Sequence, residues 1–268
     1  MEVRLTRLHE DLPFPEGPTF DAAGTLFVCV RKSGYVARIA ADGSRSRHLE
    51  IDGQPNATAF GPDGRLYVTD YRHGRLLAVE RDGTVTTVVA EYEGVPMIGL
   101  NDLAFDAAGV LYFTDSEHSL AAVNGAVYRR SPTGEVVRIA SGLRYSNGIV
   151  VTPDGAAVFV SETAEKRITL LSRKGDGTYA ARPFCRTEGG IGPDGMARRP
   201  DGSLYVANHG SGMIDVFDAG GALIAQLPAG GEKPTNCTFH RGSLYVTEDE
   251  TASVWRLDPV GEGSAWRD

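Results

Sequence analysis

A short sequence phrase recurs six times along the chain, and a residue with an oxygen-bearing side chain stands at or near the start of each copy. Each copy is followed by a turn and a second apolar run, as in FGPDGRLYVTD and VTPDGAAVFVSE. Steps of 40, 45, 46, 47 and 42 residues separate the oxygen-bearing positions, a period typical of four-stranded β-propeller blades. These positions are Glu16, Asn56, Asn101, Asn147, Asp194 and Asn236.

The strand pattern predicts how the repeats are joined. Short runs rich in Val, Leu, Tyr and Phe alternate with Asp-Gly turns, and no segment has a sustained helical period. The sixth repeat ends early, whereas residues 2–8 alternate like a strand that has no partner in its own repeat. Pairing residues 2–8 with the strand near 253–257 would remove an exposed edge. We therefore predict an all-β protein, a six-bladed propeller of four-stranded antiparallel blades closed by the N-terminal strand, with one domain over residues 1–268.

Charge and composition restrict the partners. The net charge of −8 comes without a basic block, which argues against nucleic-acid binding. The sequence contains no apolar run long enough to span a membrane and no secretory leader after Met1, so we expect a cytoplasmic protein that does not bind membranes. Cys29, Cys185 and Cys237 lie in different repeats without metal-binding spacing, which predicts buried, reduced thiols. A small-molecule substrate is the expected partner, and the sequence leaves the oligomeric state open.

The six oxygen-bearing positions are predicted to face the central channel. In a propeller blade the innermost strand begins at one mouth of the channel, so these side chains should project inward at one level. Asn and Asp are also common in turns, where they bond their own backbone. Asp201 occupies such a hairpin position, whereas Asp194 occupies the repeat position of Asn101 and Asn147. Strand propensity would not place Glu, Asp or Asn at all six positions.

Two carboxylates and up to four amide oxygens in one channel predict a metal site. Oxygen donors suit Ca²⁺ best and Mg²⁺ or Mn²⁺ less well. Zn²⁺ is the least suited alternative, because it prefers His or Cys ligands. Two carboxylates buried together are costly without a compensating cation.

Several of these segments resemble one known family. Glu16 in EGP, Asn101 in NDLAFD, Asn147 in SNGIVVTPDG and Asp194 in DGM are similar to the senescence marker protein (regucalcin) and gluconolactonase family over nearly the whole chain. The resemblance implies a six-bladed propeller with a metal held at Glu16, Asn147 and Asp194, and with Asn101 binding metal or substrate. It also implies lactone hydrolysis with Asp194 as general base. Sugar-lactone members of the family carry an Arg two residues before the Asn that matches Asn101. This chain has Gly99 at that place, so the resemblance does not include this contact with an aldonolactone.

The predicted reaction is the opening of a lactone or related ester by water. A cation in the channel would stabilise the developing oxyanion, and Asp194 would take the proton from water. The sequence has no GxSxG motif that would supply a serine nucleophile. The side chains predicted to contact substrate come from the channel and from loops at its mouth: Asn101, Asn56, Asn236, His209, Tyr71 and His118.

Other functions fit the same fold. An organophosphate hydrolase or a biosynthetic enzyme would use the same channel with a different substrate. A non-catalytic calcium-binding or scaffold propeller is the alternative outside enzymes. The channel favours the enzyme, because a scaffold has little need of two inward carboxylates within a set of amides.

Overall fold

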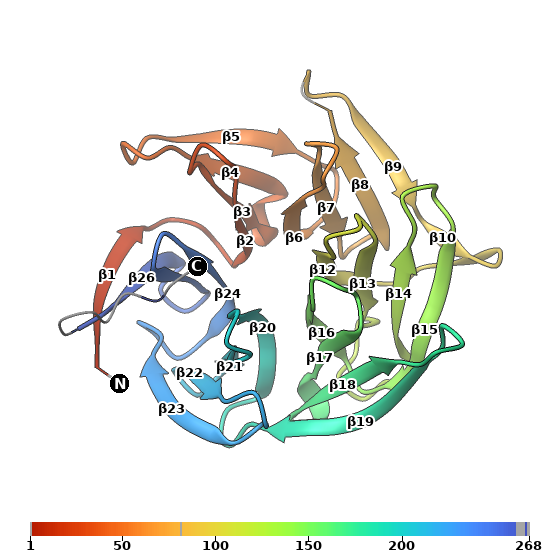
Figure 1. Ribbon diagram of the computed structural model, residues 1–268. Helices are drawn as coiled ribbons and strands as arrows, with labels where there is room; N and C mark the ends of the chain where they lie inside the picture. Colours follow the sequence, from red (N-terminus) through yellow and green to blue (C-terminus); the bar gives the residue numbers. More distant parts are fainter. Residues whose placement is uncertain (1, 81, 261–265, 267–268) are drawn as a thin grey trace.

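The computed structural model describes residues 2–80, 82–260 and 266, which fold into six four-stranded antiparallel sheets around a central axis (Figure 1). Each sheet is one blade of the predicted all-β, six-bladed propeller, so this prediction is confirmed. Helical structure in the described residues consists of two 3₁₀ turns, η1 (Arg31–Ser33) and η2 (Thr163–Glu165). No helix in this part of the chain is long and apolar enough to cross a membrane.

The first three blades use consecutive strands, ordered from the axis outward. Blade 1 contains β2 (Pro15–Phe20), β3 (Leu26–Val30), β4 (Tyr35–Ile39) and β5 (Arg45–Glu50). Blade 2 contains β6 (Pro55–Phe60), β7 (Leu66–Asp70), β8 (Arg75–Val79) and β9 (Val85–Val89). A small hairpin of β10 (Glu91–Tyr92) and β11 (Val95–Pro96) leads to blade 3, which contains β12 (Leu100–Phe105), β13 (Leu111–Asp115), β14 (Gly125–Arg130) and β15 (Val136–Leu143).

Blades 4 and 5 repeat this pattern, and blade 6 differs. Blade 4 contains β16 (Ser146–Val151), β17 (Ala157–Glu162), β18 (Arg167–Arg173) and β19 (Tyr179–Arg186). Blade 5 contains β20 (Gly192–Arg198), β21 (Leu204–His209), β22 (Met213–Phe217) and β23 (Leu223–Pro228). Blade 6 combines β24 (Pro234–His240), β25 (Ser243–Glu248) and β26 (Ser253–Pro259) with β1 (Val3–His9) from the other end of the chain.

The pairing of β1 with β26 closes the ring. The two strands are antiparallel, with Leu5 opposite Leu257 and Arg4 opposite Asp258, and they lie side by side in Figure 1. Closure by the N-terminal strand is therefore confirmed, because β1 supplies the outer strand that the sixth repeat lacks. Without β1, the backbone groups of β26 would form an exposed edge.

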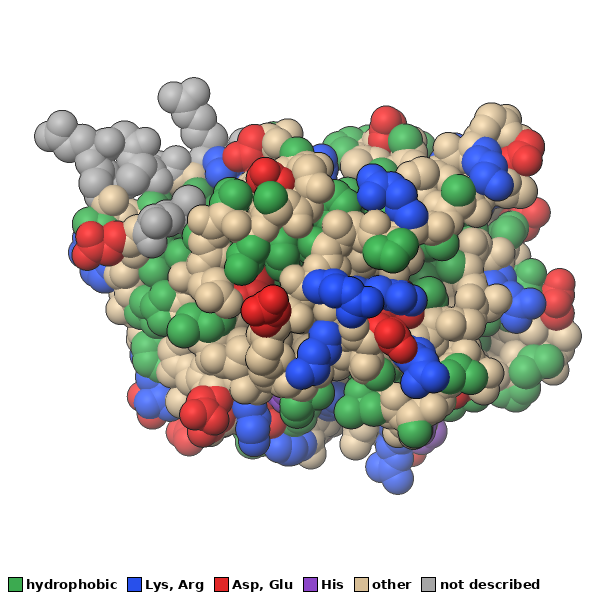
Figure 2. All heavy atoms as spheres, turned by 90° about the horizontal axis from the view of Figure 1, so that it is seen from below, with side chains coloured by type: hydrophobic (Ala, Val, Ile, Leu, Met, Phe, Trp, Pro, Cys, Tyr) green, Lys and Arg blue, Asp and Glu red, His purple; other side chains and the backbone are tan. Residues whose placement is uncertain are grey.

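Apolar side chains between neighbouring blades form the core. Between blades 1 and 2, for example, Cys29 and Val36 pack in one cluster with Leu66 and Val68, all of them buried. The three cysteines are buried and free, as the sequence predicts. On the outside, Figure 2 shows acidic and basic side chains interspersed on the face it presents. Burial between blades thus leaves the charged residues to the surface and to the channel.

The innermost strands are irregular where they carry the oxygen-bearing residues. In four of them the pairing with the second strand resumes three residues after the last pair, at Thr19, Leu103, Ile149 and Met196. In β6 and β24 the pairing resumes after two residues, at Ala57 and Asn236. A bulge of this kind places a residue outside the ladder and redirects its side chain. The longer interruptions occur in β2, β12, β16 and β20, the strands of Glu16, Asn101, Asn147 and Asp194.

Candidate functional site

A cavity of about 160 Å³ lies at one mouth of the channel, and four of the six oxygen-bearing side chains reach it. These four are Glu16, Asn101, Asn147 and Asp194. Neighbouring inner strands lie close together beside the cavity. A Cβ on Gly148 would lie 2.3 Å from the Asp194 carbonyl oxygen, so only glycine fits after Asn147. The remaining lining residues are Phe14, Arg31, Leu120, Tyr145, Thr163, Ile191 and His209.

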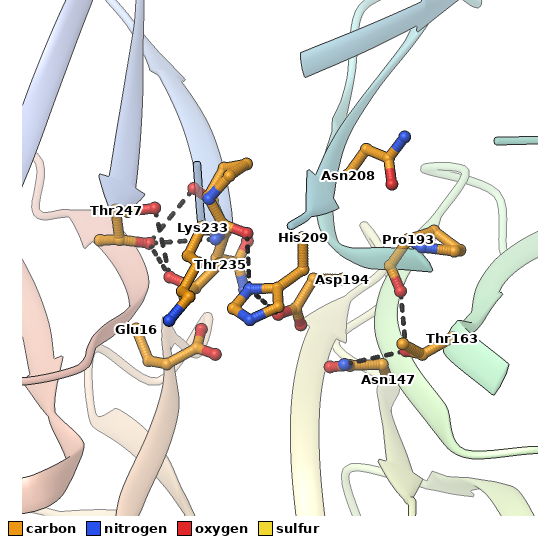
Figure 3. Close-up of polar contacts among 12 residues, drawn as sticks. Glu16, Asn147, Thr163, Pro193, Asp194, Asn208, His209, Lys233, Thr235 and Thr247 are labelled. Carbon is orange, nitrogen blue, oxygen red and sulfur yellow. Dashed lines mark hydrogen bonds and ion pairs between the residues drawn. The ribbon is translucent and has the colours of Figure 1, made fainter. Parts of the chain in front are cut away.

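Glu16, Asn147 and Asp194 point toward a common space from β2, β16 and β20 (Figure 3). The Nδ2 of Asn147 donates to Thr163 Oγ1 at 3.1 Å, and this hydroxyl donates to the Pro193 carbonyl at 2.7 Å. Thr163 thus fixes the side-chain amide of Asn147 beside the two carboxylates. The local structure therefore gathers three oxygen-bearing side chains around one space.

Asn101 is held in place by Asn56. The Nδ2 of Asn56 donates to Asn101 Oδ1 at 2.8 Å and to the Asn101 carbonyl at 3.2 Å. Asn56 is buried behind Asn101 and does not line the cavity. Its own Oδ1 is buried and has no hydrogen-bond partner among the described residues. Asn56 therefore positions Asn101 from behind the cavity wall. It does not make the substrate contact that the sequence predicts for it.

The two channel carboxylates are poorly compensated. Glu16 and Asp194 are 3% and 8% exposed. Burial, together with repulsion from Asp194, raises the pKa of Glu16 well above its usual value. Burial raises the pKa of Asp194 to about 8, although the nearby Arg31 opposes the shift. Both groups would ionise readily only if further positive charge entered the cavity.

Asp102 is a third buried carboxylate of the channel and is absent from the site residues that the sequence predicts. It accepts hydrogen bonds from the Leu103 and Ile149 backbone amides at 2.8 and 3.1 Å and from Asn236 Nδ2 at 3.5 Å. Burial raises its pKa to about 6. With Asn236 it lines a different cavity of about 330 Å³, so Asn236 does not join the four residues around Glu16. The sequence signal for Asp102 was its place directly after Asn101.

His209 lines the cavity, as the sequence predicts for this side chain, and it approaches Asp194. Its Nδ1 lies 3.7 Å from Asp194 Oδ2 and 3.2 Å from the Pro234 carbonyl (Figure 3). Burial lowers the pKa of His209, so the imidazole is neutral at pH 7 and the contact with Asp194 is not an ion pair. Because the Pro234 carbonyl can only accept, Nδ1 carries the hydrogen of the neutral ring, and Nε2 is the nitrogen that can take up a proton.

Tyr71 and His118 lie behind the cavity wall. The Tyr71 hydroxyl is 2.9 Å from the Tyr145 hydroxyl and donates to the Glu117 carbonyl at 3.1 Å. His118 Nε2 is 2.9 Å from the Tyr71 carbonyl oxygen. A Cβ on Gly99 would lie 2.8 Å from the His118 ring, so this imidazole takes the space that a longer side chain at position 99 would need. Neither predicted substrate contact faces the cavity directly.

The donors at the cavity fit a hard divalent cation. No cluster of three or more His, Cys, Asp or Glu side chains in residues 2–80, 82–260 and 266 is arranged to hold a metal. The set at the cavity instead combines the carboxylates of Glu16 and Asp194 with the amides of Asn101 and Asn147. Ca²⁺ and Mg²⁺ accept both kinds of oxygen, and a cation would offset the burial and the repulsion from Asp194 that raise the pKa of Glu16.

A family model described as the SMP-30/Gluconolactonase/LRE-like region matches residues 53–250. The chain belongs to this family. Among curated relatives it is 29% identical to diisopropyl-fluorophosphatase of Loligo vulgaris, over 96% of this chain and 93% of that protein. It is 26% identical to lactonase drp35 of Staphylococcus saprophyticus, over 94% of this chain and 81% of that protein. Among solved structures, a gluconolactonase from Xanthomonas campestris superposes with a TM-score of 0.86 at 27% identity, over 96% of this chain and 89% of that one.

Proposed function

We propose that the protein is a divalent-metal-dependent hydrolase that opens lactones or related esters. The ion, most suitably Ca²⁺, would be held by Glu16, Asn147 and Asp194, with Asn101 in or next to its coordination sphere. The observation that carries this proposal is the convergence of two buried, raised-pKa carboxylates and two amides on one cavity. Perturbed carboxylates in a cleft are candidates for function rather than stability. Relatives named as lactonase, gluconolactonase and fluorophosphatase support hydrolytic chemistry.

The residues around the cavity would have separate roles in hydrolysis. The bound ion would polarise the carbonyl oxygen of the ester. Asp194 would accept the proton of the attacking water, and His209, which lines the same cavity, would take a proton at Nε2 and release it to the solvent. Asn147 is held by Thr163, so its oxygen stays in position throughout the reaction. The base is weak, because a nearby cation lowers its pKa, and it works through its proximity to the water.

Apolar residues limit both water and substrate size. Phe14, Tyr145, Leu120 and Ile191 line the cavity with the polar groups. Leu120 and Ile191 are 46% and 47% exposed, which is consistent with a place at the open end, where they would contact an apolar part of the substrate. The volume of about 160 Å³ is small compared with the roughly 300–1,000 Å³ of sites for drug-sized ligands. A small lactone ring fits this space better than a long ester.

Organophosphate hydrolysis is the second candidate. It is favoured by the relative named diisopropyl-fluorophosphatase, with which the chain shares nearly its full length. The same metal and carboxylates would serve, because a phosphoryl oxygen is polarised like a carbonyl oxygen.

A substrate panel with controlled metal content tests the proposal. The chelator-treated protein is assayed with small lactones, aryl esters and a fluorophosphate, before and after Ca²⁺, Mg²⁺ or Mn²⁺ is restored. We expect lactone hydrolysis to disappear on chelation and to return with Ca²⁺. Calorimetric titration of Glu16→Gln should show weaker Ca²⁺ binding than the parent. Activity that survives chelation, or unchanged binding by Glu16→Gln, would refute the metal site, and Ca²⁺ binding without turnover of any compound would favour the non-catalytic propeller.

A further inference from the structure

One position at the end of the second strand is equivalent in every blade, because it follows the residue that pairs with the start of the innermost strand at Pro15, Pro55, Leu100, Ser146, Pro193 or Pro234. It stands at the channel mouth, next to the cavity described above, and three of the six line that cavity. In five blades it follows an acidic or amide residue, namely Asp70, Asp115, Glu162, Asn208 or Glu248, but in blade 1 it follows Val30. The six residues are Arg31, Tyr71, Ser116, Thr163, His209 and Asp249.

In blades 2 and 4 the strand-end acid pairs with an arginine that opens the third strand, whereas blade 1 has Val30 and Tyr35 at these two positions, so the adjacent Arg31 has no acid beside it. In blade 2, Arg75 donates to the strand-end carboxylate of Asp70 at 2.6 Å, and in blade 4, Arg167 donates to that of Glu162 at 2.8 Å. Arg31 has no such partner. Within the described residues, its guanidinium makes no hydrogen bond and no ion pair.

Two aromatic rings fix Arg31 instead. Its guanidinium carbon lies 4.1 Å from the centroid of the Tyr71 ring and 4.9 Å from that of Phe14. Its backbone amide donates to the Phe14 carbonyl at 3.1 Å. Aromatic contacts of this kind hold a guanidinium by its faces and leave its N–H groups free at the edge. The half-buried side chain therefore presents unused donors to the cavity that it lines with Glu16 and Asp194.

The charges of the site favour an anion at these donors. A divalent cation would be balanced by the carboxylates of Glu16 and Asp194. Asp102, the third channel carboxylate, is already bonded to two backbone amides and to Asn236. The charge of Arg31 would then be left without a counterion in the loaded cavity.

We propose that Arg31 determines substrate specificity by binding a carboxylate carried by the lactone or ester, an inference that rests on the proposed hydrolase function. The planar guanidinium accommodates the two oxygens of a carboxylate in parallel hydrogen bonds. This contact orients the substrate and takes no part in the bond-breaking step. The preferred substrates are small lactones with a carboxylate substituent, and the corresponding neutral compounds should be poorer.

Two matched substrates distinguish a loss of carboxylate binding from a general loss of activity. The kinetic test compares 5-oxotetrahydrofuran-2-carboxylate with its carboxamide, using the Ca²⁺-loaded parent, Arg31→Gln and Arg31→Lys. We expect Arg31→Gln to lower kcat/KM for the carboxylate by about 10- to 100-fold, mainly through KM, because hydrogen bonds to charged groups are strong. The carboxamide should change less than about threefold, and Arg31→Lys should recover part of the loss. Equal losses on both compounds, or no loss, would overturn the proposal.

Lys32→Gln is the control for charge, since this exposed residue pairs with Asp249 at 3.2 Å and does not line the cavity. It should leave the preference for the carboxylate unchanged, and a loss equal to that of Arg31→Gln would overturn the specific contact. Calorimetric binding of 5-oxoproline and its amide, which are lactams that resist hydrolysis, provides a readout independent of turnover. If no lactone is hydrolysed, weaker binding of 5-oxoproline to Arg31→Gln still supports the Arg31 contact while the hydrolase function fails. If 5-oxoproline binds the parent no better than its amide does, the Arg31 proposal fails by itself.

Discussion

Two groups of buried carboxylates lie on different strands of the blades, and they differ in the hydrogen bonds that they accept. The strand-end acids, which we define as Asp70, Asp115, Glu162 and Glu248, end the second strands of four blades. The channel acids Glu16 and Asp194 lie on the innermost strands. Both groups are less than a tenth exposed. Burial alone therefore does not decide which carboxylates stabilise the fold.

The difference lies in the hydrogen bonds. Asp115 accepts from the Ile98 and Gly99 amides at 3.0 and 2.8 Å. Burial would raise the pKa of Asp70, but hydrogen bonds from the Gln54 amide and Arg75 outweigh it and lower the pKa. Strand-end acids thus tie the loops at the mouth to the blades.

The channel acids have far fewer donors. The one backbone donor to Glu16 in the described residues is the Gly17 amide at 3.1 Å. Their raised pKa values mean that folding works against their ionised forms. Of the two groups compared, the carboxylates whose ionised forms are disfavoured by folding are those that line the cavity, where a bound cation would compensate them.

The largest expected effect is on turnover when a channel acid loses its charge. Asp194→Asn keeps an oxygen near the cavity but removes the proton acceptor, so lactone hydrolysis should fall by about 100- to 10,000-fold. The metal-free variant should be at least as stable as the parent, because an uncompensated charge is gone. Asp201→Asn, in the hairpin of the same blade, is the control and should stay active. An active Asp194→Asn enzyme at saturating Ca²⁺ would place the base elsewhere.

A strand-end acid should show the opposite result. Glu162→Gln leaves Arg167 without its charged partner, and the free energy of unfolding should fall by about 2–3 kcal/mol, since Arg167 is still 28% exposed. Urea unfolding measures this loss, and activity per folded molecule should be retained. Glu50→Gln, which breaks the exposed pair with Arg47, should have almost no effect. Equal stability of the Glu162 and Glu50 variants would contradict the role of the strand-end acids.

The pH dependence of the metal-free protein sharpens the comparison. The pKa of Asp194 is raised to about 8, whereas the unfolded value is about 3.9. Between these values the folded state binds more protons than the unfolded state, so stability should fall as pH rises, by up to about 1.4 kcal/mol per unit for one proton. The strand-end acid Glu162 has a lowered pKa and acts in the other direction, losing stability as pH falls toward the acid range.

Urea unfolding in a chelator at several pH values tests this slope. Saturating Ca²⁺ should keep the channel acids ionised and remove the slope. Asp194→Asn should flatten it without any metal, which makes this variant the internal control. A metal-free parent whose stability is constant between about pH 5 and 8 would show that the channel acids are compensated after all.

The smallest expected effect comes from Asn56, which lies behind Asn101 and outside the cavity. Asn56→Ala removes the hydrogen bonds to Asn101, so calorimetric Ca²⁺ affinity should fall by about 10-fold while the fold is kept. Asn56→Asp should lower the Ca²⁺ affinity more than Asn56→Ala does, because it adds another carboxylate behind the channel acids. Unchanged affinity in both variants would mean that Asn101 needs no support.

The sequence predicts the propeller and its closure because both depend on periodicity and on an unpaired strand. It also predicts the equivalent strand positions of Glu16, Asn56, Asn101, Asn147 and Asp194. The prediction is wrong for Asn236, because the repeat phrase in the sixth blade is displaced by one residue relative to the strand pairing. Pro234 pairs with Glu248 as Leu100 pairs with Asp115, so Thr235 has the strand position of Asn101 and Asn236 that of Asp102. Asn56 has the same strand position as Asn101 but donates to it from behind the cavity.

Arg31 is missed for a different reason. In RKSG it reads as an ordinary charged residue of a surface turn. Its meaning emerges when the six second strands are aligned, because blade 1 then has Val30 where four other blades have an acid. The contacts with Tyr71 and Phe14 join separate parts of the chain, and no local pattern encodes them.

The pairing of β1 with β26 has a consequence for how the protein is made. The ribosome produces β26 last of the described strands, and until then β1 has no partner. Blade 6 stands between Asp194 of blade 5 and Glu16 of blade 1, so these two carboxylates reach their final separation only when that blade is finished. Long-range pairing of this kind is slow. The nascent chain can therefore carry five folded blades while the candidate site is still incomplete, and a strand edge stays exposed to aggregation during synthesis.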